Sequence, residues 1–178
     1  MGRLIVSAHV TVDGVMDQLE GWFDPDTGSA VHGLEQLRAA DALVLGRESY
    51  EFLSGYWPSA DGPYAELVNP IPKHVASRTL RGPLSWNAQL LGADTVEAVA
   101  ALKERTGQLL SYGCGRLAND LARAGLVDEV RLWVNPVVWG DGVRAFAAGE
   151  LPVRMRLIGA RTFPSDVVQL SYQPVGPA

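Results

Sequence analysis

Cysteine is nearly absent from this sequence of 178 residues, which contains only Cys114. A single cysteine cannot form an internal disulfide, and the positions of His9, His32 and His74 match no zinc or iron–sulfur spacing. The sequence therefore predicts no bound metal. Such sparing use of cysteine is typical of a cytoplasmic protein.

Long hydrophobic runs are absent as well. The apolar opening Leu4-Ile5-Val6 is interrupted by His9 and Asp13, far short of the roughly 20 apolar residues that a membrane helix needs. Basic runs are also missing, because Lys and Arg are scattered and the formal net charge is −5. These absences argue against a membrane segment and against nucleic acid as a partner.

The chain does contain enough apolar residues for one core. Hydrophobic types make up 47% of it, and it has no internal repeat, low-complexity tract or interior linker. We therefore expect a single domain over residues 1–174 and a loose tail over residues 175–178.

Segments with strand and helix patterns alternate along most of the chain. Asp94 and Glu97 have capping-box spacing, and Gly125 is typical of a helix end. The expected strands are 3–10, 42–45, a short one around Val75, 108–112 and 129–135. The expected helices are 31–37, 47–53, one turn at 64–68, one from Asp94 up to Gly107, and 116–124, with a long loop over 11–29.

The C-terminal part has a different pattern. Residues 154–163 and 167–173 flank the turn Pro164-Ser165-Asp166, which is typical of an antiparallel hairpin. The alternation of strands and helices before it favours a parallel sheet with helices on its faces. We therefore predict an α/β fold in which a mostly parallel central sheet, flanked by helices, carries an antiparallel C-terminal hairpin.

Three predicted strands end in a short polar turn that carries an arginine. These turns are Gly46-Arg47-Glu48-Ser49, Ser77-Arg78-Thr79 and Gly113-Cys114-Gly115-Arg116. Ligands of open α/β sheets bind outside the carboxyl ends of the strands, where helix starts face anionic oxygens. Three such turns predict a phosphorylated cofactor. Two arginine contacts to a ribose 2′-phosphate would favour NADPH over NADH by about a hundredfold or more.

Each turn alone has a simpler interpretation. Gly113 to Ala118 matches the dinucleotide fingerprint, but it comes late in the chain and Asp128 follows too early to hold a ribose. Its glycines are equally explained by close packing of a helix on a strand. A single arginine is more often a solvated surface charge than a ligand contact. Only the repetition of the pattern favours cofactor binding.

The motifs taken together resemble the dihydrofolate reductase superfamily, specifically small proteins akin to the reductase domain of riboflavin biosynthesis. The resemblance covers nearly the whole chain and implies a three-layer fold. The matching segments are Thr11-Val12-Asp13-Gly14, Leu45-Gly46-Arg47-Glu48-Ser49-Tyr50, Val75-Ala76-Ser77-Arg78-Thr79-Leu80, Gly113-Cys114-Gly115-Arg116-Leu117, and Gly125-Leu126-Val127-Asp128-Glu129 leading to Asn135-Pro136-Val137.

The resemblance implies that NADPH lies across the carboxyl ends of the strands and assigns residues to it. The implied contacts are Gly46, Arg47 and Ser49 with phosphate at a helix start, Ser77, Arg78 and Thr79 on the 2′-phosphate side, and Gly113, Cys114, Gly115, Arg116 and Leu117 with the pyrophosphate. It also implies a non-proline cis peptide at Gly113-Cys114. A homodimer is implied too, and the C-terminal hairpin offers an edge for it.

The resemblance also bears on the substrate. Dihydrofolate reductase has a carboxylate on its first helix, whereas the matching stretch Ser29-Ala30-Val31-His32 has none, which argues against dihydrofolate as substrate. The closer likeness is to 5-amino-6-(5-phosphoribosylamino)uracil reductase. We therefore expect an NADPH-dependent reductase that transfers a hydride to a small pterin- or pyrimidine-like heterocycle. The alternative is a non-catalytic nucleotide- or ligand-binding protein that retains the fold.

Few side chains are needed for such chemistry, because the protein mainly orients two rings, excludes water and supplies a proton. Asp13 and Asp24 are the candidate proton donors, although each also suits a turn, Asp13 before Gly14 and Asp24 before Pro25. Trp22 and Trp57 are candidates to bind a flat substrate. Packing in the core is the alternative for a tryptophan.

Overall fold

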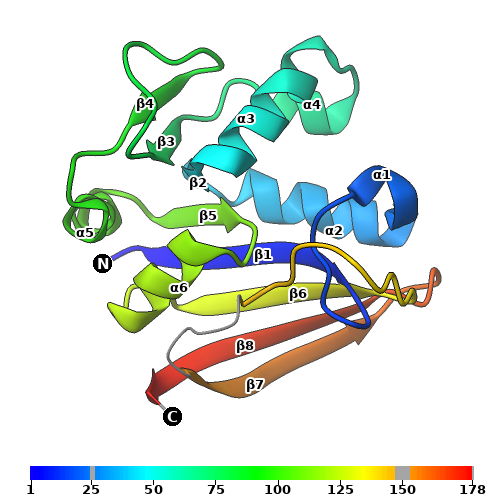
Figure 1. Ribbon diagram of the computed structural model, residues 1–178. Helices are drawn as coiled ribbons and strands as arrows, with labels where there is room; N and C mark the ends of the chain where they lie inside the picture. Colours follow the sequence, from blue (N-terminus) through cyan, green and yellow to red (C-terminus); the bar gives the residue numbers. More distant parts are fainter. Residues whose placement is uncertain (25–26, 147–152, 178) are drawn as a thin grey trace.

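The computed structural model describes residues 1–24, 27–146 and 153–177. Their strands form one sheet in the order β4-β3-β2-β5-β1-β6-β8-β7 (Figure 1). The bounds are β1 Arg3–Thr11, β2 Ala42–Gly46, β3 Lys73–Ala76, β4 Ala88–Leu90, β5 Gln108–Tyr112, β6 Glu129–Asn135, β7 Val153–Thr162 and β8 Val168–Pro177. Pairing is parallel from β4 to β6 and antiparallel for β8 and β7. The predicted topology is confirmed.

Helices cover both faces of the parallel part. They are α1 Leu19–Trp22, α2 Thr27–Arg38, α3 Arg47–Tyr56, α4 Pro63–Val68, α5 Thr95–Arg105 and α6 Arg116–Arg123, with a 3-10 turn at Trp57–Ser59. One buried cluster joins α5 and α6 to the sheet, through residues such as Leu102 and Leu121. A second cluster joins α2, α3 and α4 to the other face, through Leu37, Tyr50 and Val68. The result is the expected three-layer α/β fold.

The central strand β1 shows why the two faces differ. Leu4, Val6, Ala8 and Val10 alternate along the strand and all pack on the α5 and α6 side. Ile5 packs on the opposite side, which is the side of α2. Because the side-chain period of a strand is two residues, Ser7 and His9 share that side with Ile5. The face of β1 under α2 therefore becomes polar toward the carboxyl end.

Local sequence signals explain several element ends. The Asp94 carboxylate accepts a hydrogen bond from the Glu97 N–H at 3.0 Å, which caps the start of α5 as the spacing predicted. Gly125 follows α6 with φ of 70°, a conformation that favours glycine. The hairpin turn is closed by the Phe163 N–H, which donates to the Val167 carbonyl oxygen at 2.9 Å. These three predictions are confirmed.

Other expectations were wrong. The segment expected to be one loop over 11–29 contains α1 and the start of α2, and the strand β4 was not predicted. The tail expected to be loose pairs within β8 as far as Pro177, opposite Val153, while residue 178 lies outside the described residues. No peptide bond of the described chain is cis, including Gly113-Cys114. Among these same residues, no helix is both long and apolar enough to cross a membrane.

Candidate functional site

The three arginine turns lie at one edge of the sheet. They follow β2, β3 and β5, which are consecutive strands in the order β3-β2-β5 and run parallel to one another. Parallel strands have their carboxyl ends at the same edge, so Gly46, Ser77 and Gly113 begin neighbouring turns. We call residues 46–49, 77–79 and 113–117 the arginine rim.

Two turns of the arginine rim are in direct contact. The Ser49 hydroxyl, in the first turn of α3, donates a hydrogen bond to the Tyr112 carbonyl oxygen at 3.2 Å. The next residue, Gly113, has φ of 92°, and its N–H donates to the Ser7 carbonyl oxygen at 2.9 Å. A glycine is required there because other residues rarely adopt this backbone conformation. The Ser49 hydroxyl thus holds the glycine turn against the start of α3.

Both helix starts on this edge lack a side-chain cap. Gly46 is the N-cap residue of α3 and Gly115 that of α6, and neither has a side chain to bond the first N–H groups. The first turn of α6 also contains no acidic residue. Unpaired N–H groups and the positive end of the helix dipole suit an anion. The residues of the rim therefore fit a phosphate group.

The arginine side chains of the rim are exposed and only weakly held. Arg47 forms ion pairs within α3, with Glu51 at 3.0 Å and Glu48 at 3.2 Å, and its side chain is 42% exposed. The Arg116 Nε lies 3.8 Å from the Asp120 carboxylate, and 72% of its side chain is exposed. Arg78 is exposed as well. Such surface pairs contribute little stability, so a phosphate can replace them at low cost.

The other predicted rim residues contribute through the backbone or close the turn. The Ser77 hydroxyl oxygen accepts hydrogen bonds from the N–H groups of Thr79 at 3.2 Å and Leu80 at 2.9 Å. Cys114 is fully buried in the first core cluster, where burial raises the pKa of its thiol to about 12. Leu117 packs against the same cluster. The Cys114 and Leu117 side chains therefore pack the glycine turn against the first core cluster.

Asp13 is not placed to give up a proton. Its carboxylate accepts hydrogen bonds from the Thr11 hydroxyl at 2.7 Å and from the N–H groups of Trp139 at 3.0 Å and Gly140 at 2.9 Å. These donors hold its pKa well below the usual range. Because donors of the chain itself occupy this carboxylate, it is not free to pass a proton to a substrate. Asp13 instead joins the end of β1 to residues 137–146, and we call this contact the Asp13 clasp.

The remaining candidates divide between the surface and the interior. Asp24 is exposed. Trp22 is buried, and its indole N–H donates to the Asp17 carbonyl oxygen at 2.8 Å. Trp57 stacks on Tyr64, with ring centroids 4.5 Å apart, and packs against the second core cluster. Both tryptophans named as substrate contacts therefore pack within the fold.

A histidine without a predicted role, His9, lies near the carboxyl end of β1. The His9 ring stacks on Trp133 at 5.4 Å and meets the edge of Phe23 at 4.5 Å. The Asn135 amide nitrogen is 3.5 Å from its Nδ1. Burial lowers the pKa of His9 to about 4, so the imidazole is neutral at pH 7. A neutral ring both donates and accepts hydrogen bonds.

A polar network lies beside His9 under α2. The buried Ser7 hydroxyl oxygen accepts from the Gln36 amide and from the Trp133 indole N–H, each at 3.0 Å. Gln36 also bonds the Tyr112 side chain, whose hydroxyl is 2.5 Å from that of Tyr64. Burial raises the pKa of Tyr112 well above 10 and that of Tyr64 to about 12, so both keep their protons.

The sequence contained a signal for part of this network. Ser7 and His9 occupy alternate positions in an otherwise apolar strand, near the end where ligands bind. Such a pattern indicates polar side chains on one face of that strand. Gln36 and Tyr112 had no comparable signal, because their roles depend on how α2 crosses the sheet.

Comparisons with known proteins agree with this architecture. The model of the RibD C-terminal domain family matches residues 3–169. The uncharacterized protein YyaP of Bacillus subtilis is 32% identical over 181 residues, which cover 96% of this chain and 94% of that protein.

Two solved structures share the fold. A proposed riboflavin biosynthesis protein from Shewanella sp. PV-4 has a TM-score of 0.75 at 22% identity, covering 97% of this chain and 98% of that one. A pyrimidine reductase-like protein from Corynebacterium diphtheriae has a TM-score of 0.71 at 15% identity, covering 98% and 92%. With the family match over most of its length and this reductase-type fold, the chain belongs to the RibD C-terminal domain family.

Proposed function

We propose that the protein is an NADPH-dependent reductase of a small pyrimidine- or pterin-like heterocycle. One observation carries the proposal. Three arginine turns follow three adjacent parallel strands, two of them open into uncapped helices, and Ser49 joins those two through the Tyr112 carbonyl. This arrangement suits a ligand with several phosphates. Membership of a riboflavin-biosynthesis family supports a reductase.

The rim residues divide the binding of the cofactor among them. Arg78 and the turn Ser77–Thr79 would hold the 2′-phosphate side, and the starts of α3 and α6 would hold the remaining phosphates. When bound, NADPH supplies the hydride for the reduction. Gly46 and Gly113 keep the backbone free of Cβ atoms where phosphate approaches. Arg47 and Arg116 add charge on the open side of the rim.

The residues under α2 would orient the substrate ring. His9 is neutral at pH 7 and its Nδ1 faces the Asn135 amide nitrogen, so its Nε2–H is the donor that it would offer to a ring oxygen or nitrogen of a pyrimidine. Phe23 and Trp133 fix the plane of that imidazole. Asp24 is our candidate proton donor, because it is exposed and directly follows Phe23. A solved structure of the same fold is described as pyrimidine reductase-like, which favours this substrate class.

Fluorescence titration with NADPH tests the cofactor site. We expect binding at micromolar concentration and a dissociation constant raised by about a hundredfold or more in the double variant Arg47→Ala/Arg78→Ala. Arg156→Ala is the matched control, because Arg156 is exposed on β7 and, within the described part of the chain, bonds only the Gln173 side chain, at 2.9 Å. Loss of affinity in this control, or none in the double variant, would contradict the proposal.

Gln36 favours a second candidate function, binding without turnover. Its side chain is buried and bonds Ser7 on β1, and its amide cannot give up a proton as a carboxylic acid does. A protein that held the nucleotide but reduced nothing would fit this feature. Cofactor oxidation measured with a panel of pterins and pyrimidines distinguishes the two. Tight NADPH binding with no oxidation across the panel favours the second candidate.

We also propose a cytoplasmic homodimer. β7 is the last strand of the sheet, and exposed apolar side chains lie on this hairpin, with Leu157 53% and Ile158 50% exposed. An edge strand with unpaired backbone and apolar side chains favours pairing with a second copy. Light scattering at dilute concentration should give twice the mass of one chain. Leu157→Lys should reduce the mass to that of one chain; a single-chain mass for the wild type, or a doubled mass that Leu157→Lys leaves unchanged, would contradict this assembly.

A further inference from the structure

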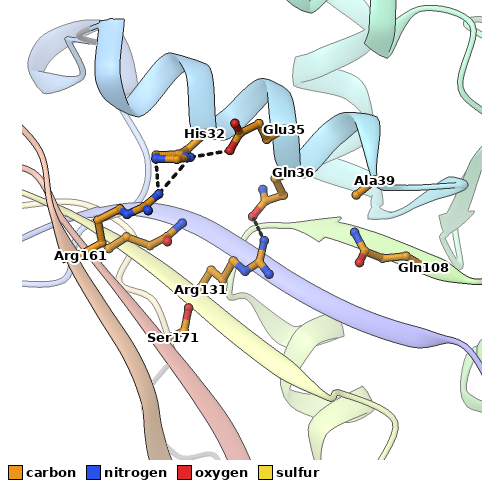
Figure 2. A pocket seen from close by; sticks show the side chains of 9 residues that line it. His32, Glu35, Gln36, Ala39, Gln108, Arg131, Arg161 and Ser171 are labelled. Atoms are coloured by element: carbon orange, nitrogen blue, oxygen red, sulfur yellow. Dashed lines mark hydrogen bonds and ion pairs between the residues drawn. The ribbon is translucent and has the colours of Figure 1, made fainter.

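A polar cavity of about 290 Å³ lies between α2 and the strands of the C-terminal half. Among the described residues, none of the arginine rim lines it. One end is at Gln108, which begins β5, and the other is at Arg161, which pairs with Gln169 and, through it, lies in register with Trp133 of β6. Figure 2 shows side chains from α2 and from several strands directed toward it. The lining residues are His32, Glu35, Gln36, Ala39, Gln108, Arg131, Arg161, Gln169 and Ser171.

Two guanidinium groups enter this cavity from different strands. Arg131, on β6, donates from Nη1 to the Gln36 amide oxygen at 3.1 Å and from Nε to the Glu129 carboxylate at 2.6 Å. Arg161, on β7, lies against the His32 ring, as Figure 2 shows. Arginine is the side chain best suited to a planar oxyanion. Arg131 also donates from Nη2 to Glu129 at 3.2 Å, so its guanidinium is held by the chain, while Arg161 contacts the His32 ring; both line the same cavity.

The charges of the cavity leave a positive excess. Arg131 shares the Glu129 carboxylate with Arg3, whose Nη2 is 2.9 Å from it, while Glu35 lies 2.6 Å from the His32 ring. The charged lining residues are Arg131, Arg161 and Glu35, and the pair Arg3–Glu129 behind Arg131 adds one charge of each sign. This local excess of one positive charge occurs in a chain whose net charge is −5. The cavity attracts an anion that the chain as a whole would repel.

The neutral lining points to a small molecule and away from a protein partner. Gln108, Gln169 and Ser171 are half-buried and offer both donors and acceptors. Ala39 is the only lining residue without a polar side chain. A protein interface has an apolar centre, which this cavity lacks. Its volume approaches the lower end of small-ligand pockets, roughly 300 Å³.

We propose that this cavity is a second ligand site, for a small metabolite that carries a phosphate or carboxylate group. Arg161 binds the oxyanion, Arg131 adds its positive charge from beside Gln36, and the side chains of Gln108 and Gln169 bond the polar remainder of the molecule. Gln36 forms the inner wall and stays bonded to Ser7. The site does not depend on NADPH binding, so it holds whether or not the proposed reductase activity is confirmed.

Calorimetric titration with inorganic phosphate and with succinate tests this site, in the Arg47→Ala/Arg78→Ala background to weaken phosphate binding at the rim. We expect binding of at least one probe with a dissociation constant below about 1 mM, weakened at least about tenfold by Arg161→Ala. Whichever probe binds more tightly identifies the acid group. Arg156→Ala is the matched control on the same strand and should leave the affinity unchanged.

Two results would overturn the proposal. One is the absence of binding for both probes, and the other is an equal loss of affinity in Arg161→Ala and Arg156→Ala, which would indicate general surface charge. The melting temperature without ligand should be the same in both variants, because both side chains are exposed. NADPH titration of the Arg161→Ala single variant should match the wild type, which separates this site from the rim.

Discussion

The arginine rim and the Asp13 clasp both lie at the carboxyl ends of parallel strands, but their polar groups differ in whether the chain itself pairs them. In the clasp, the Asp13 carboxylate receives three donors from the chain itself. In the rim, the N-terminal groups of α3 and α6 have no side-chain cap, and Arg116 is 72% exposed. A region whose polar groups are already paired is scaffold, and one that leaves them available is suited to a ligand.

The largest effect should come from breaking the clasp with Asp13→Asn. An amide keeps one acceptor oxygen but turns an NH2 group toward backbone N–H donors, so at least one bond is lost and a repulsive contact replaces it. Thermal unfolding at pH 7 should show a markedly lower melting temperature. NADPH affinity of the folded variant should change little.

Asp13→Asn should also change how the stability of the protein depends on pH in acid. The folded pKa of Asp13 lies below the unfolded value of 3.8, so its contribution to stability is present above that value and is lost as the pH falls further. Asp13→Asn should therefore lose less stability than the wild type on acidification. Asp141→Asn, in the same segment, removes a charge but keeps an oxygen that can accept the bond from the adjacent Gly142 N–H, and it is the matched control. Unchanged melting with abolished turnover would instead make Asp13 the acid.

A second prediction compares two glycines within the rim. Gly113→Ala forces φ of 92° on an alanine, which costs about 1–3 kcal/mol, and it should lower both stability and NADPH affinity. Gly46 has φ of −72°, and nothing lies within 4 Å of a Cβ placed there. Gly46→Ala should therefore keep the melting temperature while weakening NADPH binding. Urea unfolding and cofactor titration of both variants measure this separation. Equal stability losses would show that the two turns are strained alike.

The edge-of-sheet arrangement was predictable because strand ends and glycine turns are local signals. Gly46 and Gly113 indicated turns directly in the sequence. The alternation of strands and helices indicated a parallel sheet, which places both turns at the same edge. The role of Asp13 was not predictable, because its partners Trp139 and Gly140 are more than 120 positions away. Nothing local distinguishes an aspartate in a turn from one that bonds a distant loop.

The polar network under α2 was equally difficult to predict from the sequence. Trp22 and Trp57 were predicted to contact substrate because of their residue type, yet their rings pack within the fold. Gln36 looked like an ordinary helix residue, although its side chain is buried against Ser7. How deeply the Gln36 side chain is buried depends on how α2 crosses β1 and β6. This is a tertiary feature that the periodicity of the sequence does not encode.

A smaller effect is expected from the bond that joins the two turns of the rim. Ser49→Ala removes the donor to the Tyr112 carbonyl oxygen and should cost about 0.5–1.5 kcal/mol of stability. NADPH affinity should fall by a few-fold, since the glycine turn loses its support. Ser54→Ala is the control, because that hydroxyl bonds only within α3, at 3.4 Å from the Glu51 oxygen. Equal behaviour of the two variants in urea unfolding and titration would show that the bond does not position the rim.

The smallest effect at neutral pH should come from His9→Phe, which tests whether the α2 face behaves as scaffold or as site. Phenylalanine keeps the ring between Phe23 and Trp133, so stability at pH 7 should hardly change. In the wild type the folded pKa of about 4 lies below the unfolded value of 6.5, so the unfolded chain binds more protons between them and stability falls as pH falls through that window. When the unfolded chain binds one proton more than the folded chain, the free energy of unfolding changes by up to about 1.4 kcal/mol per pH unit.

His9→Phe should remove that slope while leaving the part due to His74, whose pKa burial and Arg105 also lower. Urea unfolding at pH 7 and at pH 5 measures the difference. If His9 also contacts substrate, turnover falls in His9→Phe at a pH where stability is unchanged. Loss of stability at pH 7 with no effect on turnover would instead assign His9 to the scaffold, together with the clasp.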